Sequence, residues 1–156
     1  MNDVASQIAS TFADAGARGY LHARAIGGDA EVAVGADEPV VLASVFKIAV
    51  AVAFAREVAA GRLDGTERAR VTSRYRIGGI GTAGCTDAEV RIAAKTGTLP
   101  AVRNEAGVLT YPDGHRYAVA VFTHAESLAE RQPAVDAAIG RTARLAVDHL
   151  RSLEER

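Results

Sequence analysis

The sequence predicts a single α+β domain with helices packed on an antiparallel sheet. The chain has 156 residues, 49% of them hydrophobic, which is enough to bury a core. Apolar residues recur at helical spacing near both ends and once in the middle, while short alternating segments between them predict about five strands. Consecutive strands are separated by short turn-like segments, which is typical of antiparallel pairing.

The N-terminal segment predicts a helix over residues 3–17, ended by Gly16 and Gly19. A hairpin follows, with strands over residues 20–26 and 31–35 and a turn at Gly27-Gly28-Asp29. The apolar stripe of the helix recurs every four residues: Val4, Ile8 and Phe12.

The middle of the chain predicts a second helix over residues 44–60, ended by Gly61. A short apolar segment, residues 40–42, leads into it. Residues 63–90 show no clear period, and we expect them to form a loop.

The last third of the chain predicts three strands and a helix. The strands span residues 91–97, 103–110 and 115–123, and Tyr111-Pro-Asp-Gly114 forms the turn between the last two. The helix spans residues 133–153, with apolar positions at Val135, Ile139, Leu145 and Leu150.

Composition argues against several classes of partner. The net charge is −1 and the charges are interspersed, so we expect no nucleic-acid and no membrane partner. The longest apolar stretch, residues 48–55, is too short to span a bilayer. No secretory signal precedes the first helix, which predicts a cytoplasmic protein as the sequence is written, or a periplasmic or secreted one if it is a processed chain.

Metal and cofactor chemistry are not expected. The four histidines lack ligand spacing, and Cys85 has no partner for a disulfide. Residues 79–84 fit G-x-G-x-x-G but lack the surrounding strand–helix–strand unit, so we interpret them as a loop and not as a nucleotide site.

The first motif that carries chemistry is S-x-x-K, at Ser44 and Lys47. This spacing on a helix places the two side chains one turn apart on the same face. A serine hydroxyl becomes a good nucleophile when a neighbouring base removes its proton, and a lysine amine can be that base when burial or nearby cations favour its neutral form. The alternative is a serine N-cap followed by a solvated lysine.

The second motif is K-T-G, at Lys95, Thr96 and Gly97, on a predicted strand. It offers a cation and a hydroxyl to a substrate carboxylate, and its glycine allows another backbone to approach closely. By itself the motif is too short to be specific.

Together, the two motifs resemble those of the serine β-lactamase and penicillin-binding protein family. The phrases Leu42-Ala-Ser-Val-Phe-Lys47, Lys95-Thr-Gly-Thr-Leu99 and Arg103-Asn-Glu-Ala106 add to the likeness, which covers nearly the whole chain. It implies the α/β half of a class A β-lactamase: a sheet of about five strands with the terminal helices on one face and the S-x-x-K helix on the other.

The resemblance also implies roles for individual residues. Ser44 would be the acylated nucleophile, Lys47 its activating partner, and Lys95 a further catalytic cation. Lys95 and Thr96 would hold the carboxylate of a β-lactam-like acyl substrate. Together with Gly97 and Thr98 they would form the substrate-binding strand, and the backbone N–H groups of Ser44 and Thr98 the oxyanion hole.

Two expected features of the family are missing from the sequence. There is no Ser-Asp-Asn motif, and no glutamate can be assigned to activating the water that removes the acyl group. Only residues 48–94 separate Lys47 from Lys95, where the family carries a helical domain. We interpret residues 63–90 as the loop remnant of a natural or deliberate deletion within one domain spanning residues 1–156.

Three functions remain open at this point. The chain is an impaired β-lactamase-like hydrolase, an inactive domain that acts as a binding or structural module, or a weak serine esterase for another acyl substrate.

The apolar helix makes a further prediction. Residues 48–54 are apolar all round, so that the sheet would cover one face and leave the other bare. We expect the chain to self-associate through this helix, unless residues 63–90 fold back to cover it.

Overall fold

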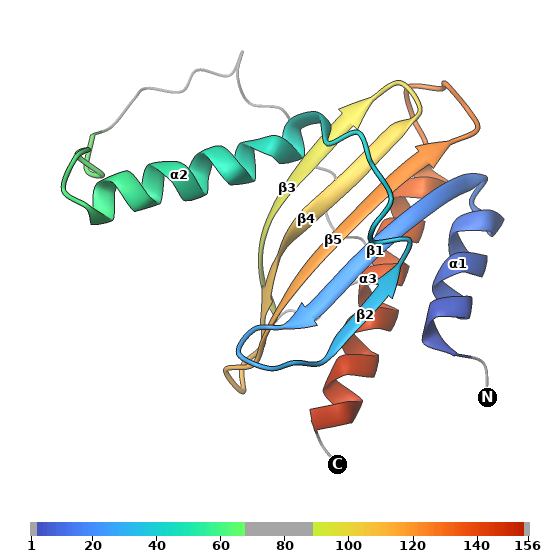
Figure 1. The fold of residues 1–156 in the computed structure, drawn as a ribbon. Helices are drawn as coiled ribbons and strands as arrows, with labels where there is room; N and C mark the ends of the chain where they lie inside the picture. Colours follow the sequence, from blue (N-terminus) through green and yellow to red (C-terminus); the bar gives the residue numbers. More distant parts are fainter. Residues whose placement is uncertain (1–2, 68–88, 155–156) are drawn as a thin grey trace.

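The computed structural model describes residues 3–67 and 89–154, which form one antiparallel sheet flanked by helices (Figure 1). Cys85 and the glycine-rich segment 79–84 lie outside these residues, as does most of the expected loop 63–90. The elements are α1 (Val4–Asp14), β1 (Ala17–Ala25), β2 (Glu31–Val34), the 3₁₀ turn η1 (Ala43–Phe46), α2 (Lys47–Ala59), β3 (Arg91–Leu99), β4 (Val102–Thr110), β5 (Arg116–Ala125) and α3 (Pro133–Glu154).

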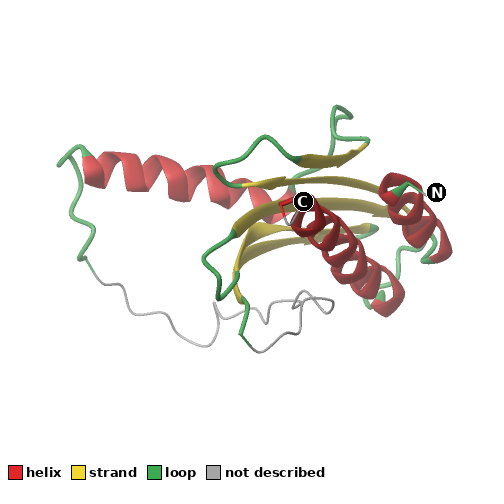
Figure 2. Ribbon diagram, turned by 90° about the horizontal axis from the view of Figure 1, so that it is seen from below, coloured by secondary structure: helices red, strands yellow, loops and turns green. Residues whose placement is uncertain are grey.

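The sheet has five strands in the order β2-β1-β5-β4-β3, and every neighbouring pair is antiparallel. Helices α1 and α3 lie side by side on one face, and the segment that carries η1 crosses the other (Figure 2). The predicted fold class is therefore confirmed, including the five strands and the placement of the terminal helices.

The core lies between the sheet and the pair α1 and α3. Alternate residues of β1 and β5 point into it, as the period of a strand with one buried face requires. Its largest fully buried side chains are Tyr117, Phe12, Ile8, Leu21, Leu150, Val121, Val147 and Thr142. Most of the apolar stripe predicted for each terminal helix is buried here.

The boundary between α1 and β1 differs from the prediction. Gly16 has a φ of +69° and forms the turn, so the helix ends at Asp14 and β1 begins at Ala17. Gly19 does not end the helix but lies within β1, where a Cβ atom would come 2.1 Å from Cγ of Phe12. The second glycine therefore allows α1 to pack closely on the sheet.

Helix α2 departs most from expectation. It projects beyond the sheet (Figure 1), and none of its residues is buried. The prediction that the sheet covers one of its faces is wrong, because an open hollow of about 470 Å³ separates α2 from β3 and β4. None of the described helices is long and apolar enough to cross a membrane.

Candidate active site

The two residues of the S-x-x-K motif are in contact. The Nζ of Lys47 donates a hydrogen bond of 2.8 Å to the Oγ of Ser44. We predicted that Ser44 begins an α-helix. It lies instead in the 3₁₀ turn η1, and α2 begins at Lys47. A 3₁₀ turn repeats every three residues, so it still places both side chains on one side. Ser44 is half-buried and Lys47 is exposed.

The residue before Ser44 has a strained backbone. Ala43 has a φ of +47°, a region that costs a non-glycine residue free energy and that persists only where the surroundings enforce it. This conformation bends the chain as it enters η1. Nothing about an alanine in the sequence indicates this strain.

Strand β3 packs against this bend. Gly97 is buried, and a Cβ atom at this position would come 2.7 Å from the carbonyl oxygen of Leu42 and 3.2 Å from the Cβ of Ala43. Only a glycine lets the Ser44 turn pack this closely on the strand. The predicted close approach of a backbone to the K-T-G glycine is confirmed, and the two motifs meet.

The other residues of the K-T-G strand divide between its two faces. Lys95 is half-buried, lies on the α2 side of the sheet and donates a 2.6 Å hydrogen bond from Nζ to the carbonyl oxygen of Thr96. Thr96 and Thr98 alternate with it and lie on the opposite face. Because β3 is an edge strand, one row of its backbone N–H and C=O groups is not used by the sheet.

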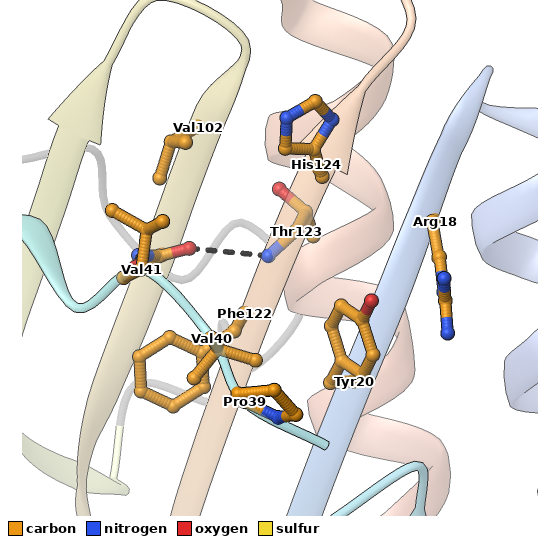
Figure 3. Close-up of a pocket in the computed structure, with 10 residues that line it drawn as sticks. Arg18, Tyr20, Pro39, Val40, Val41, Val102, Phe122, Thr123 and His124 are labelled. Atoms are coloured by element: carbon orange, nitrogen blue, oxygen red, sulfur yellow. Dashed lines mark hydrogen bonds between the residues drawn. The ribbon is translucent and has the colours of Figure 1, made fainter.

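Asn104 positions the turn from the neighbouring strand. Its Nδ2 donates to the carbonyl oxygens of Val41, at 2.7 Å, and Leu42, at 3.4 Å, and its Oδ1 accepts a 3.1 Å hydrogen bond from the backbone N–H of Thr123 (Figure 3, dashed line). Asn104 is 3% exposed. Sequence patterns did not indicate this role, because Asn104 belongs to no Ser-Asp-Asn motif.

A hollow of about 270 Å³ opens beside the segment that leads to Ser44 (Figure 3). Val40, Val41 and Phe122 give it apolar walls, and Arg18 and His124 lie at its rim. Arg18 already pairs with Glu38 at 3.9 Å and stacks on the ring of Tyr20. Ser44 and Lys47 line neither this hollow nor the one beneath α2.

No carboxylate of the described residues forms a hydrogen bond or an ion pair with Ser44 or Lys47. Glu57 instead pairs with Arg62, whose hydrogen bonds lower the pKa of that carboxyl group. Glu105 is buried opposite Thr96 and lies on the α3 face. Burial, and then the neighbouring Asp136, raise its pKa to about 7. Within the part of the chain that the structure describes, no group of three or more metal-binding side chains is assembled.

A serine–lysine pair on a turn that packs against an edge strand is the architecture of the serine β-lactamases and penicillin-binding proteins. The model of the beta-lactamase enzyme family matches the chain over residues 3–89 and 83–150. The chain therefore belongs to this family.

Solved structures show the same fold at low sequence identity. Penicillin-binding protein PBP-A, as the acyl-enzyme of its L158E mutant with penicillin G, aligns with a TM-score of 0.69 and 16% identity over 98% of this chain and 97% of that one. The β-lactamase of Sphaerobacter thermophilus aligns with a TM-score of 0.68 and 17% identity over 95% and 96%. The class A β-lactamase reconstructed for the last common ancestor of Gram-negative bacteria gives 0.73 and 16% over 94% and 98%.

A curated relative matches a shorter region. The beta-lactamase regulatory protein BlaB of Streptomyces cacaoi is 42% identical over 59 residues, or 38% of this chain. The match spans only 19% of that protein's length.

Proposed function

We propose that this protein is a β-lactamase-like serine hydrolase that transfers an acyl group from a β-lactam amide or a related ester to Ser44. The observation that carries the proposal is the 2.8 Å hydrogen bond between Lys47 and Ser44, on a turn held against Gly97 of the K-T-G strand. The family membership supports the same chemistry.

The acylation step uses groups of the Ser44 turn. Lys47, in its neutral form, takes the proton from the Ser44 hydroxyl as Oγ attacks the substrate carbonyl carbon. The carbonyl oxygen becomes an oxyanion, which the backbone N–H groups of Ser44 and Thr98 stabilise. The carbon–nitrogen bond of the β-lactam then breaks, the nitrogen receives the proton, and an ester on Ser44 remains.

Lys95, Thr96, Gly97 and Thr98 form the substrate-binding strand in this proposal. The ammonium group of Lys95 binds the carboxylate of the substrate from the α2 side of the sheet. The hydroxyl of Thr96 lies on the opposite face of the strand, so it binds the same carboxylate only around the free edge of β3. The free edge of β3 binds the substrate backbone or amide by hydrogen bonds, because its N–H and C=O groups are not used by the sheet.

Hydrolysis of the ester is the impaired step. It needs a base for the attacking water, and a well-placed acid–base group contributes about 10²–10⁴ in rate. The described residues place no carboxylate on Ser44 or Lys47, and Glu105 lies on the other face of the sheet. We expect an acyl-enzyme that forms and then persists.

A shortened connection between the motifs accounts for this loss. The two matches of the family model overlap at residues 83–89, inside the segment 63–90 where we place the remnant of the helical domain. We propose that residues 1–156 are one domain and that the missing part would have supplied the Ser-Asp-Asn motif and the water-activating glutamate.

Intact-protein mass spectrometry after incubation with excess benzylpenicillin tests acylation directly. We expect one penicilloyl adduct on the wild-type chain and none on Ser44→Ala. A chromogenic cephalosporin and a chromogenic ester are measured on the same sample. Turnover that depends on Ser44 without a trapped adduct would show that deacylation is not the slow step. The absence of both adduct and turnover would refute the proposal.

A second candidate function is a binding module without catalysis. The 59-residue match to a protein named as a β-lactamase regulator favours it, as does the open position of the exposed Lys47. Reversible binding of benzylpenicillin by both the wild type and Ser44→Ala, with no adduct on either, would favour this function. Turnover of the ester alone would favour a weak serine esterase.

The same proposal includes self-association through α2. This helix has exposed apolar side chains along its length, including Val50, Val52 and Phe54. Burying them against a second copy removes apolar surface from water.

A further inference from the structure

Helix α2 has two apolar faces, and they point in opposite directions. Ile48, Ala51, Val52 and Ala55 line the hollow over β3 and β4, at the spacing of one helix face. Val50 and Phe54 lie about half a turn away around the helix and are 56% and 47% exposed. The sheet can serve only the first face.

The outer face has the spacing of a helix-pairing seam. Lys47, Val50, Phe54 and Glu57 follow one another at intervals of three, four and three residues, which keeps them on one stripe. Two apolar residues therefore lie between a cation at the N-terminal end and an anion at the C-terminal end. Such a stripe is complementary to itself when it is read in the opposite direction.

Two copies of α2 can pair in the antiparallel direction about a two-fold axis at the level of Val52. Every residue of this stripe then lies opposite a complementary residue of the second copy. Val50 then lies opposite Phe54 of the partner subunit, and Phe54 opposite Val50 of the partner subunit. In the layers beyond them, Lys47 lies opposite Glu57 of the partner subunit, and the reverse holds at the other end. A parallel pair would instead place Lys47 against the partner's Lys47, which costs free energy.

We propose that two copies of this chain pair through the outer face of α2 in the antiparallel direction, with Val50 and Phe54 at the centre and reciprocal Lys47–Glu57 contacts at the ends. This inference rests on the self-association proposed above and is independent of acylation. Glu57 already pairs with Arg62 through both oxygens, at 2.5 and 2.7 Å, and a carboxylate can accept further hydrogen bonds.

The pairing has a consequence for the site. Lys47 contacts Ser44, so Glu57 of the partner subunit comes beside the serine–lysine pair. The second copy would then supply a carboxylate and a wall on the open side of α2. The described residues of one chain provide neither at this place.

Sedimentation equilibrium over a range from low to high micromolar protein tests the pairing. The wild type and Ser44→Ala should both reach the mass of two chains. Phe54→Asp should stay at the mass of one chain, whereas the control Leu128→Asp should still dimerise, because Leu128 is 75% exposed and lies outside α2.

Charge exchange tests the direction of the helices. Lys47→Glu and Glu57→Lys should each raise the dissociation constant roughly tenfold, because like charges then face each other, and the double variant should return it close to the wild-type value. Arg62→Gln, which removes only the pair within one chain, should leave the dimer intact.

The possible failures are distinguishable. If Phe54→Asp does not weaken the dimer, this geometry is wrong but self-association stands. The same holds if the double charge variant does not restore the dissociation constant of the wild type. A wild-type chain that remains monomeric at every concentration overturns both. Slow amide hydrogen exchange in the α2 of such a monomer would show that the chain itself covers the helix. Mass spectrometry with benzylpenicillin reports on acylation independently.

Discussion

The two faces of the sheet differ in how far they bury the apolar residues of the neighbouring helices. Helix α3 buries nine of its residues against one face, and α1 packs beside it, whereas α2 buries none on the other side. All three helices contain many apolar residues. The difference shows that apolar content alone does not predict burial, because burial also needs a second surface of matching shape.

The residue patterns of the helices account for this contrast. In α3 the buried residues follow the helical period, and exposed charges such as Arg141 and Asp148 occupy the opposite side. In α2 residues 48–55 carry no polar side chain at all. The first pattern fits one neighbour, the sheet, and the second requires two neighbours. Among residues 3–67 and 89–154, neither neighbour is provided in full.

Substituting one phenylalanine in α1 and one in α2 tests this comparison, and it gives the largest change in stability that we predict. Phe12 in α1 is 1% exposed and Phe54 in α2 is 47% exposed. Phe12→Ala should lower the free energy of unfolding by about 3–5 kcal/mol, because it leaves a cavity against Gly19. Phe54→Ala should change it by no more than about 0.5 kcal/mol. Urea denaturation followed by circular dichroism measures both.

Both variants are measured at a protein concentration low enough to keep the chain monomeric. In a dimer, burial of Phe54 would add to the free energy of unfolding. Equal losses for the two variants would contradict the comparison, because they would show that α2 is packed as tightly as α1.

Burial of Glu105 on the α3 face of the sheet makes the stability of the chain depend on pH. The folded-state pKa of this carboxyl group is about 7 against an ordinary value of 4.5, because it is buried and lies near Asp136. Between these two pH values the unfolded chain releases the proton and the folded chain keeps it, so wild-type stability falls as the pH rises from about 4.5 to about 7. Glu105→Gln carries no such charge and should escape this loss.

We therefore expect Glu105→Gln to unfold with nearly the wild-type free energy at pH 4 and to be about 2–3 kcal/mol more stable than the wild type at pH 8. Urea titrations at a series of pH values measure the difference. Glu67→Gln, at an exposed position, is the control and should show no such trend. A Glu105→Gln curve that runs parallel to the wild type would show that Glu105 is not the source of the pH dependence.

Much of the fold could be predicted from the sequence, because its elements follow local rules. The stripe of Val4, Ile8 and Phe12 and the alternation in β1 and β5 each depend on one buried face, and both are present in the structure. The boundary at Gly16 was misplaced by a few residues, since two glycines close together gave two possible helix ends. Whether α2 lies on the sheet depends on contacts between distant segments, which local patterns do not specify.

The candidate site divides in the same way. Ser44, Lys47 and Gly97 could be identified from short motifs, and their contacts are present in the structure. Asn104 could not, because its function depends on lying opposite Gly97 in the β3–β4 register and near the carbonyl oxygen of Val41, more than sixty residues earlier. The strain at Ala43 is likewise imposed by its neighbours.

Asn104 attaches the Ser44 turn to the sheet, and its substitution should cost less stability than Phe12→Ala. Asn104→Ala removes the hydrogen bonds to Val41 and Leu42 and leaves the N–H of Thr123 without its side-chain acceptor. The expected cost is about 1–2 kcal/mol of unfolding free energy. The rate of acylation by benzylpenicillin should fall more steeply, by about a hundredfold, because the bend that presents Ser44 loses its attachment to the sheet.

Thr123→Val separates these two effects. It removes the hydrogen bond from the hydroxyl of Thr123 to the carbonyl oxygen of Arg103 in the same buried region, yet it leaves the bonds from Asn104 to Val41 and Leu42 in place. Its cost in stability should be similar to that of Asn104→Ala, while the acylation rate measured by mass spectrometry should stay near the wild-type value. If both variants lose acylation in proportion to their stability, then Asn104 acts only as part of the core. If Asn104→Ala alone loses it, Asn104 positions Ser44 by fixing Val41 and Leu42 to the sheet.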